Sequence, residues 1–407
     1  MKNKALVLGL YINGYSIIRE LAKDPTINIV GVDNDRAKIG LASRYLSERF
    51  VVDYKGDDNI FLNFLINYGK KHDEKIVIYP THDHHTKLLA KYYSELKEFY
   101  HMPINPKTIP KVISKRNQYD MCEKMGIPYP KTIYINSDED LEKSKIEIKK
   151  VFFPVVIKPF SRAENPADSL DFRTIKINCY SDFERLFPKL KGYVNHGFLV
   201  SEIIPGEPEN IWAYTGYLDE KSDVLAGWTG RKLTQRPYYF GVFSAARCEI
   251  NPIVEEQGIK LLKAFDFIGL GEPEFKYDYR DGKYKLMEIN PRYMMWHIVG
   301  MQGGVNLPLI QYYHMIGEKN KLGHMQKKQN KKFAHIVFME SELLNIIDHK
   351  PKSKFIQNSI NSFMLRNKIW AITNFNDPLP GIKNFVQFNL IKAIVGPILS
   401  KFRILSN

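Results

Sequence analysis

Residues 271–292 read GEPEFKYDYRDGKYKLMEINPR and carry the clearest structural signal in the chain. Two runs rich in β-forming residues flank the dipeptide Asp281-Gly282, which is typical of a tight hairpin turn. The stretch therefore predicts a β-hairpin whose second strand ends at Asn290.

The polar side chains of this hairpin suit a hard cation. Side chains alternate between the two faces of a strand, so Glu288 and Asn290 are expected on one face and Ile289 on the core side. Glu274 lies on the partner strand and is expected to reach the same face. Carboxylate and amide oxygens are suitable ligands for Mg²⁺, with Mn²⁺ as an alternative. Arg292 follows and would neutralise charge that develops during phosphoryl transfer.

Acid-rich hairpins are also common as solvated strand faces, and that alternative stays open on this stretch alone. The run Glu288-Ile289-Asn290-Pro291-Arg292, with Glu274 upstream, resembles the metal-binding end of the ATP-grasp ligases. The resemblance implies that Glu274, Glu288 and Asn290 hold the metal, that Arg292 is catalytic, and that ATP is bound.

Length and composition set the class of protein. The chain has 407 residues, 44% of them hydrophobic and 26% charged, which is ordinary for a globular protein of two or three domains. Its three cysteines, Cys122, Cys179 and Cys248, are far apart. They form no disulfide framework and no zinc spacing, which favours a reducing compartment.

The formal net charge of +14 admits nucleic acid, anionic membranes or phosphate-rich substrates as partners. The lysines are scattered and no nucleic-acid-binding motif accompanies them, which disfavours nucleic acid. No stretch approaches the roughly 18 apolar residues of a membrane span. The apolar run near the N-terminus is short and lacks a cleavage site. These features predict a cytoplasmic protein, with the inner face of the membrane as an alternative.

The chain opens with a strand, a turn, a helix and a second strand: Ala5–Leu10, Asn13-Gly14, Ser16–Lys23 and Ile29–Asp33. Further strands are predicted at Val51–Asp53 and Lys75–Tyr79, with a helix over Asn59–Lys71 between them. Gly9 and Gly14 do not complete the G-x-G-x-x-G pattern of dinucleotide-binding folds. The opening therefore predicts a Rossmann-like domain without a bound dinucleotide.

The strand at Ile76–Tyr79 runs into Pro80-Thr81-His82-Asp83-His84-His85, which is predicted to be a loop. A metal site is one interpretation, but consecutive loop residues point in different directions. Loops at the carboxyl ends of parallel strands line the ligand crevice of open α/β sheets. The preferred prediction is therefore that His82 and Asp83, together with His84, line a substrate pocket.

Two lysines extend the resemblance to ATP-grasp enzymes. Ser114 is predicted as the N-cap of a helix that ends at Gly126. Lys115, at the start of that helix, and Lys158, on a strand over Phe153–Pro159, resemble the lysines that contact nucleotide phosphates in the family. The alternative for Lys115 is an ordinary surface lysine at a helix start.

The loop after Lys158 departs from the family pattern. Residues 161–170, SRAENPADSL, contain no glycine, so backbone amides cannot cradle phosphate as a glycine-rich loop does. The side chains proposed as replacements are Ser161, Arg162, Ser169 and Arg173.

Residues 197–210, GFLVSEIIPGEPEN, resemble the hinge of the family, where adenine binds. By that resemblance Glu202 and the backbone of Ile203 and Ile204 meet the adenine edge, and Glu207 or Glu209 meets the ribose, with Glu209 preferred. The alternative is a strand edge with solvated acids.

Basic residues gather shortly before the hairpin. Arg231 and Lys232 are predicted to hold the γ-phosphate and an acyl phosphate, and Arg247 to bind a substrate carboxylate. A solvated basic turn is the alternative for the first two.

Residues 382–407 contain no acidic residue, and apolar residues recur there at near-helical spacing among lysines and an arginine. This pattern fits an interfacial helix on anionic lipid, and equally a terminal helix packed on its own protein. Peripheral membrane contact through this basic tail and a homodimer therefore stay open as partners.

The ordered motifs predict an α/β and α+β protein in three parts. These are a Rossmann-like pre-ATP-grasp domain over residues 1–110, an ATP-grasp domain over 111–325 with a lid subdomain at about 130–200, and a C-terminal extension over 326–407. Among ATP-grasp enzymes the chain most resembles carboxylate–amine ligases related to D-aspartate ligases and to carbamoyl-phosphate synthase large-subunit modules.

The resemblance implies ATP-dependent formation of an amide from a small-molecule carboxylate and an amine. The reaction would pass through an acyl phosphate and release ADP and phosphate, with an amino acid as one expected substrate. The alternatives are a nucleotide-binding protein without ligase activity and a basic membrane-associated or nucleic-acid-associated module.

Overall fold

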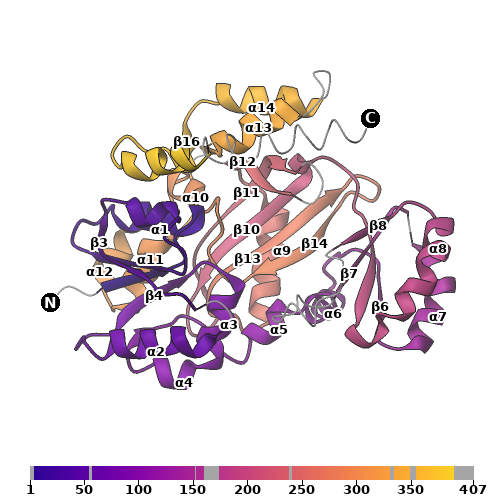
Figure 1. Ribbon diagram of the computed structural model, residues 1–407, viewed down its shortest axis with the longest axis horizontal. Helices are drawn as coiled ribbons and strands as arrows, with labels where there is room; N and C mark the ends of the chain where they lie inside the picture. Colours follow the sequence, from indigo (N-terminus) through magenta and orange to yellow (C-terminus); the bar gives the residue numbers. More distant parts are fainter. Residues whose placement is uncertain are drawn as a thin grey trace.

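The structure is a computed structural model that describes residues 4–54, 57–151, 153–159, 174–237, 241–330, 334–348 and 354–388. Its strands form a five-stranded, a seven-stranded and a four-stranded sheet (Figure 1). The five-stranded sheet lies within the predicted first domain, and the four-stranded sheet within the predicted lid subdomain. The seven-stranded sheet lies in the middle of the molecule and also includes two strands from the predicted C-terminal extension.

The first sheet is parallel, with strand order β3-β2-β1-β4-β5. Its strands are β1 (Lys4–Leu8), β2 (Asn28–Asp33), β3 (Leu46–Val51), β4 (Ile76–Pro80) and β5 (Tyr100–His101). The helices connecting them are α1 (Ile12–Leu21), α2 (Asp58–Gly69), α3 (Asp83–Lys91) and α4 (Tyr93–Leu96). Along β1, Ala5 and Val7 join one hydrophobic cluster and Leu6 and Leu8 another, as the strand period requires. This arrangement confirms the predicted Rossmann-like domain.

Three local predictions in this domain are wrong. Asn13-Gly14 lies inside α1 and not in a turn, because the helix begins almost directly after β1. A Cβ at Gly14 would lie 1.9 Å from the carbonyl oxygen of Gly9, so only glycine permits this close approach. The strand predicted at Val51–Asp53 ends at Val51. The predicted loop of histidines lies in the first turn of α3, with His82 as its N-cap.

The lid subdomain is a four-stranded antiparallel sheet with order β6-β9-β7-β8. Its elements are β6 (Thr132–Ile135), α7 (Asp138–Glu147), β7 (Val155–Pro159), β8 (Ile175–Ile177), α8 (Tyr180–Lys191) and β9 (Phe198–Glu202). It projects from the right-hand side of the molecule in Figure 1 and has a hydrophobic core of its own, which includes Leu141, Phe183 and Phe198.

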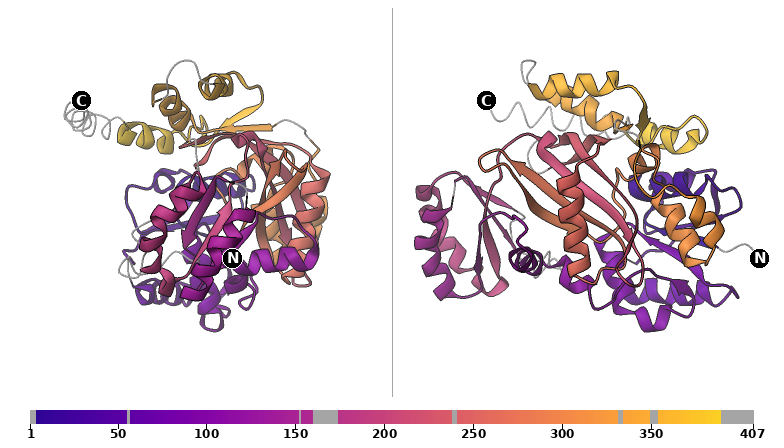
Figure 2. Two further views of the ribbon diagram at one scale, coloured as in Figure 1. Left: turned by 90° about the vertical axis from the view of Figure 1, so that its right-hand side faces the viewer. Right: turned by 180° about the vertical axis from the view of Figure 1, so that it is seen from behind.

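The seven-stranded sheet has the order β14-β13-β10-β11-β12-β15-β16. Its strands are β10 (Ile211–Leu218), β11 (Val224–Arg236), β12 (Val242–Cys248), β13 (Gly269–Asp278), β14 (Lys283–Asn290), β15 (Ala334–Val337) and β16 (Lys368–Trp370). Helix α9 (Pro252–Ala264) lies across this sheet, as the right-hand view of Figure 2 shows. Helices α5 (Ile109–Ile113) and α6 (Lys115–Met125) lead from the first domain toward it.

The residues after β14 bind the domains together. Helices α10 (Ile298–Gln302) and α11 (Leu307–Met315) lie beside α1, and their buried side chains share its hydrophobic cluster. Helix α12 (Lys319–His324) packs against α11 and has no buried residue. Strands β15 and β16 extend the central sheet, and α13 (Met339–Asp348) and α14 (Lys354–Met364) lie above it in Figure 1. In the described part of the chain, no helix is long and apolar enough to cross a membrane.

Candidate active site

The hairpin of β13 and β14 forms as predicted. Gly282 has φ 70° in the turn, and Ile289 is buried in the core. Glu274 pairs with Glu288 across the two strands, and Glu272 pairs with Asn290. Cross-strand partners share a face, so the three predicted metal ligands lie on one face of the hairpin.

Cations surround the two carboxylates. Lys232 Nζ lies 2.9 Å from Glu274 Oε2, and Lys115 Nζ lies 3.7 Å from Glu288 Oε2. Lys115 also donates to the carbonyl oxygen of Met287 at 3.0 Å, which holds its ammonium beside the hairpin. The structure therefore brings together residues from α6, β11 and β14 that are far apart in the sequence.

Charge and burial oppose one another at Glu288. Burial favours the neutral carboxyl, but Lys115, Lys232, Lys158 and Arg292 outweigh it and lower the pKa of Glu288 to about 2. Glu288 is therefore ionised at neutral pH. Burial raises the pKa of Glu274; Lys232 opposes this shift, and the carboxylates of Glu288 and Glu272 reinforce it.

Lys158 reaches the hairpin from the lid subdomain. It lies on β7, and burial together with the charge of Lys115 lowers its pKa to about 8. The helix that carries Lys115 has the predicted ends: Ser114 Oγ accepts from the backbone N of Asn117 at 3.4 Å, and Gly126 has φ 65°. The two lysines therefore reach the carboxylates from separate elements, Lys115 from α6 and Lys158 from β7 of the lid subdomain.

Glu272 is a buried carboxylate that the sequence analysis did not select. Its oxygens accept from His297 Nε2 at 2.5 Å, Trp296 Nε1 at 2.9 Å and Thr215 Oγ1 at 3.3 Å. Asn290 Nδ2 donates to the remaining oxygen at 3.4 Å. The contact turns the amide nitrogen of Asn290 toward Glu272. No hydrogen bond within the described ranges engages the amide oxygen, Oδ1, of Asn290.

This donor set fits a divalent cation of the Mg²⁺ type. It offers two carboxylates and one amide oxygen, and the remaining ligands of Mg²⁺ are usually water and phosphate oxygens. Among the described residues, no group of three or more His, Cys, Asp or Glu side chains is placed to hold a metal on its own. The site therefore fits a cation that arrives with phosphate rather than one held by protein ligands alone.

Arg292 connects the hairpin to the first domain. Its Nε donates to Asp83 Oδ1 at 2.6 Å and its Nη2 lies 3.4 Å from Asp83 Oδ2. The backbone N of Tyr293 donates to the carbonyl oxygen of Pro80 at 3.4 Å, so the end of β14 lies against the carboxyl end of β4. Burial and the charge of Arg292 lower the pKa of His82.

The neighbouring histidines point away from this contact. His84 Nε2 lies 3.1 Å from Asp58 Oδ1, and His85 Nε2 lies 2.8 Å from the hydroxyl of Tyr54. Burial, followed by the charges of its neighbours, lowers the pKa of His85 to about 3, so its ring is neutral at pH 7. The three histidines do not converge on one point.

The predicted cations Arg231 and Arg247 share one carboxylate. Glu249 Oε2 accepts from Arg231 Nε at 2.8 Å and from Arg247 Nε at 2.6 Å. Arg231 also lies over the ring of Trp212, 5.2 Å from its centroid, and its Nη1 is 3.5 Å from the carbonyl oxygen of Glu209. Glu249 therefore sets the orientation of both guanidinium groups.

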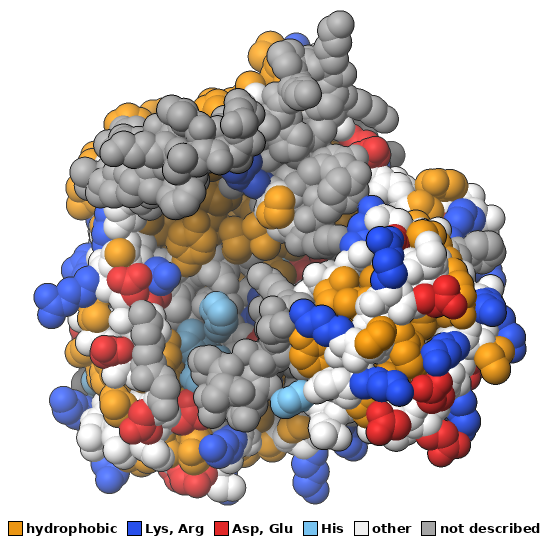
Figure 3. Space-filling view, turned by 45° about the vertical axis from the view of Figure 1, so that its right-hand side comes forward, with side chains coloured by type: hydrophobic (Ala, Val, Ile, Leu, Met, Phe, Trp, Pro, Cys, Tyr) orange, Lys and Arg blue, Asp and Glu red, His pale blue; other side chains and the backbone are white. Residues whose placement is uncertain are grey.

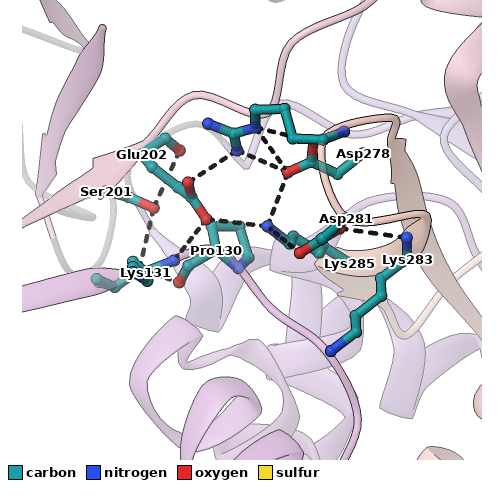
Figure 4. A network of polar contacts seen from close by, with 10 residues as sticks. Pro130, Lys131, Ser201, Glu202, Asp278, Asp281, Lys283 and Lys285 are labelled. Atoms are coloured by element: carbon teal, nitrogen blue, oxygen red, sulfur yellow. Dashed lines mark hydrogen bonds and ion pairs between the residues drawn. The ribbon is translucent and has the colours of Figure 1, made fainter. Parts of the chain in front are cut away.

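Glu202 lies in a network that joins the lid subdomain to the hairpin turn (Figure 4). Its Oε1 accepts from the backbone N of Lys131 at 3.0 Å and lies 3.3 Å from Lys285 Nζ. Its Oε2 accepts from Arg280 Nη2 at 2.8 Å, and Asp278 accepts from both cations. The side chain predicted to meet adenine thus has both oxygens engaged within the protein.

The other hinge residues have separate surroundings. The backbone N of Ile203 donates to the carbonyl oxygen of Pro154 at 3.0 Å, and Ile204 is buried. Glu209 Oε1 accepts from Asn358 Nδ2 at 3.4 Å. Glu207 acts on Lys276, whose pKa is lowered to about 8 by burial although Glu207 opposes that shift.

Sequence reasoning missed Glu272, Glu249 and Lys276. Glu272 and Lys276 lie two residues before and two residues after Glu274 on β13, so the two-residue period of a strand predicts all three on one face. Glu249 carries no such signal, because its role depends on the pairing of β11 with β12. The predicted phosphate loop residues Ser161, Arg162, Ser169 and Arg173 lie outside the described residues.

Figure 3 shows a hollow on one face of the molecule, with hydrophobic and histidine side chains on the visible part of its floor. Arg292 also lines a mostly apolar pocket, together with residues that include Ile78, Met102, Phe267 and Tyr293.

Known proteins resemble this chain in sequence and in fold. No protein-family model matches the chain. A D-aspartate ligase from Enterococcus faecium (strain Aus0004) is 27% identical over 249 residues, which is 58% of this chain and 58% of that protein. The chain therefore matches less than two thirds of the length of this relative.

Solved structures share the fold at low sequence identity. N5-carboxyaminoimidazole synthetase from Staphylococcus aureus complexed with ADP superposes with a TM-score of 0.62 at 14% identity, over 86% of each chain. L-amino acid ligase from Bacillus licheniformis gives a TM-score of 0.57 at 13% identity, over 80% of this chain and 77% of that one. The biotin carboxylase domain of 2-oxoglutarate carboxylase from Hydrogenobacter thermophilus, with MgADP, gives 0.58 at 17% identity, over 82% and 73%. The chain therefore has the ATP-grasp fold that its sequence predicts, preceded by a Rossmann-like domain, and its sequence is similar to that of a D-aspartate ligase.

Proposed function

We propose that this protein is an ATP-dependent ligase that joins a carboxylate to an amine, releasing ADP and phosphate. The observation that carries the proposal is the pairing of Glu274 with Glu288 beside Asn290, within reach of cations from three parts of the chain. The likeness to D-aspartate ligase, L-amino acid ligase and MgADP-bound carboxylase structures supports it.

Each residue has a chemical task in this proposal. Glu274, Glu288 and Asn290 would hold Mg²⁺ or Mn²⁺, which supplies positive charge to the phosphate oxygens when bound. The ammonium groups of Lys115, Lys158 and Lys232 would balance further phosphate charge. Their side chains come from separate elements, which suits an extended anionic ligand.

The substrate is placed where Arg292 meets Asp83 of the first domain. Arg292 lies between the hairpin and Asp83, so it would contact the carboxylate while phosphate is transferred to it. His82 lies next to this pair. The Arg231–Glu249–Arg247 group is left out of this proposal, because Arg231 stacks on Trp212 on the face of the central sheet opposite Lys232 and Glu274. Asp83 would meet the ammonium of an amino acid. A carboxyl phosphate would then react with the amine, and exclusion of water protects it from hydrolysis.

The adenine of ATP would be met by backbone atoms near Glu202, Ile203 and Ile204, because both oxygens of the Glu202 carboxylate are engaged within the protein. The ribose would be met by Glu207 or Glu209. The similarity to a D-aspartate ligase and to an L-amino acid ligase supports an amino acid as one substrate. D-aspartate and L-amino acids are therefore the first compounds to test.

The test is release of ADP from ATP and Mg²⁺ with D-aspartate or L-amino acids, each offered with a panel of carboxylates and amines. Glu288→Gln combined with Asn290→Ala should abolish turnover in a folded protein, while Glu256→Gln, an exposed residue of α9, should leave it unchanged. Release of AMP and pyrophosphate with the true substrates, or full turnover in the double variant, would overturn the proposal.

A further inference from the structure

The helix over residues 378–388 presents its apolar side to solvent. Leu379, Ile382, Phe385 and Val386 are 53%, 56%, 59% and 49% exposed. Each of these positions is three or four residues from another of them, so they form one continuous stripe. A helix packed on its own protein normally has the opposite orientation.

Polar contacts hold the other side of this helix against the protein. Lys383 Nζ donates to the carbonyl oxygens of Arg36 at 2.7 Å and Lys38 at 2.9 Å. Gln387 Nε2 donates to the carbonyl oxygen of Ala37 at 2.8 Å. Asn384 donates to the carboxylate of Glu340 on α13. The apolar stripe is therefore turned outward by hydrogen bonds to two separate parts of the molecule.

The charge of the surrounding sequence selects a partner for the stripe. Residues 378–407 contain four lysines and arginines and no aspartate or glutamate, in a chain with a formal net charge of +14. An exposed apolar stripe in a basic stretch of sequence without acidic residues has the composition of a helix that lies in the interface of an anionic membrane.

We infer that the stripe formed by Leu379, Ile382, Phe385 and Val386 binds the surface of an anionic lipid membrane. Binding would place the apolar side chains among the headgroups and leave the polar contacts of Lys383 intact. This inference is independent of the proposed ligase activity, because none of these residues lies in the candidate active site.

The experiment is co-sedimentation of the full chain with vesicles of phosphatidylcholine, alone or mixed with phosphatidylglycerol. The protein should bind the mixed vesicles in preference, and less so at high salt. Replacing Ile382 and Phe385 together by serine should weaken binding about tenfold or more, because two large apolar side chains no longer leave water. The matched control replaces Ile146 of α7 and Ile253 of α9 by serine, since these are 67% and 54% exposed.

Equal binding by the Ile382/Phe385 variant and the control variant would overturn the inference, as would no binding to the mixed vesicles. Analytical ultracentrifugation tests whether a second copy of the chain occupies the stripe instead of a membrane. A dimer that dissociates in the Ile382/Phe385 variant, without vesicle binding by the unaltered chain, would assign the stripe to a second copy and refute the membrane. ADP release by the same variants is measured separately, so failure of one proposal does not imply failure of the other.

Discussion

At the scale of single residues, the charges around Glu288 decide what the hairpin can bind. Four cations lower the pKa of this carboxyl to about 2 although it is partly removed from water. These cations come from separate parts of the chain and act on one carboxylate of the hairpin. Such a group of cations suits a polyanion that brings its own divalent cation.

The pKa of Lys158 leads to a pH dependence. Burial and Lys115 lower this pKa from 10.5 to about 8, so the folded protein loses the ammonium charge as the pH rises through that value. Affinity for ATP should therefore be full below about pH 8 and fall above it, by up to about tenfold per pH unit for one linked proton. Calorimetric titrations at a series of pH values measure the slope.

Two variants separate Lys158 from general effects of pH. Lys158→Arg should flatten the slope, because a guanidinium stays protonated throughout. Lys97→Arg, at an exposed position, should keep it. If both variants follow the unaltered protein, Lys158 does not contact the nucleotide.

Glu272 gives a second prediction at this scale. It accepts from Asn290 Nδ2 and is itself held by His297 and Trp296, so we expect it to orient the amide of Asn290 for a cation. Glu272→Gln should weaken Mg²⁺ binding by about 10-fold to 100-fold, as is typical of groups behind a ligand. Calorimetry of MgADP over a range of Mg²⁺ concentrations reports this directly.

A purely structural role for Glu272 has a different signature. The melting temperature would fall while the concentration of Mg²⁺ required for half-saturation stayed the same. That result, with Glu256→Gln as the unaffected reference, would contradict orientation of Asn290 by Glu272.

At the scale of elements, the start of β13 ties the candidate site to the linker between the domains. Gly269 has φ 90°, and a Cβ there would lie 1.8 Å from the carbonyl oxygen of Pro103. Gly282, in the hairpin turn, has φ 70°, but its nearest neighbour to an added Cβ is 4.0 Å away. The two glycines therefore share a backbone conformation and differ in the space around them.

This difference predicts unequal effects of alanine. Gly282→Ala should lower the free energy of unfolding by about 1–2 kcal/mol, the cost of a left-handed residue with a side chain. Gly269→Ala should lower it by more than about 3 kcal/mol, because the linker backbone must also move. Thermal unfolding of the two variants in parallel compares them, and equal losses would show that the contact with Pro103 is easily relieved.

At the scale of the whole molecule, the C-terminal residues close the structure over the first domain. Asp377 is fully buried and accepts from Ser43 Oγ at 2.6 Å and from the backbone N of Arg44 at 2.9 Å. Arg19 Nη1 donates to the carbonyl oxygen of Trp370 at 3.0 Å. Residues more than 300 positions apart thus share one buried interface.

Removal of this carboxylate should loosen the C-terminal segment. Asp377→Ala leaves the buried hydroxyl of Ser43 and the partly buried N–H of Arg44 without their acceptor, which costs about 1–3 kcal/mol for a fully buried group. Hydrogen exchange should accelerate in residues 371–388, whereas Asn376→Ala, at an exposed side chain, should not change it. Unchanged protection in the Asp377→Ala variant would mean that other contacts hold the segment.

Local signals in the sequence predicted the elements and their order. The alternation of Glu288, Ile289 and Asn290, the turn at Gly282 and the cap at Ser114 depend on neighbours within a few residues, and the structure has all three. The order of the motifs along the chain predicted the ATP-grasp fold through its resemblance. Local signals failed at Asn13-Gly14, where close packing against Gly9 lets the helix begin at Ile12, ahead of the predicted turn dipeptide.

Only the tertiary structure decided which charges meet. The contact of Arg292 with Asp83 joins residues 209 positions apart, and Glu249 orients Arg231 and Arg247 only because β11 and β12 are paired. The outward orientation of the stripe on residues 378–388 likewise depends on carbonyl oxygens near residue 37. Charged partners are interchangeable in a sequence, because many residues of suitable sign are present. Burial and the packing of distant elements select one pair among them, and that selection is a property of the folded chain.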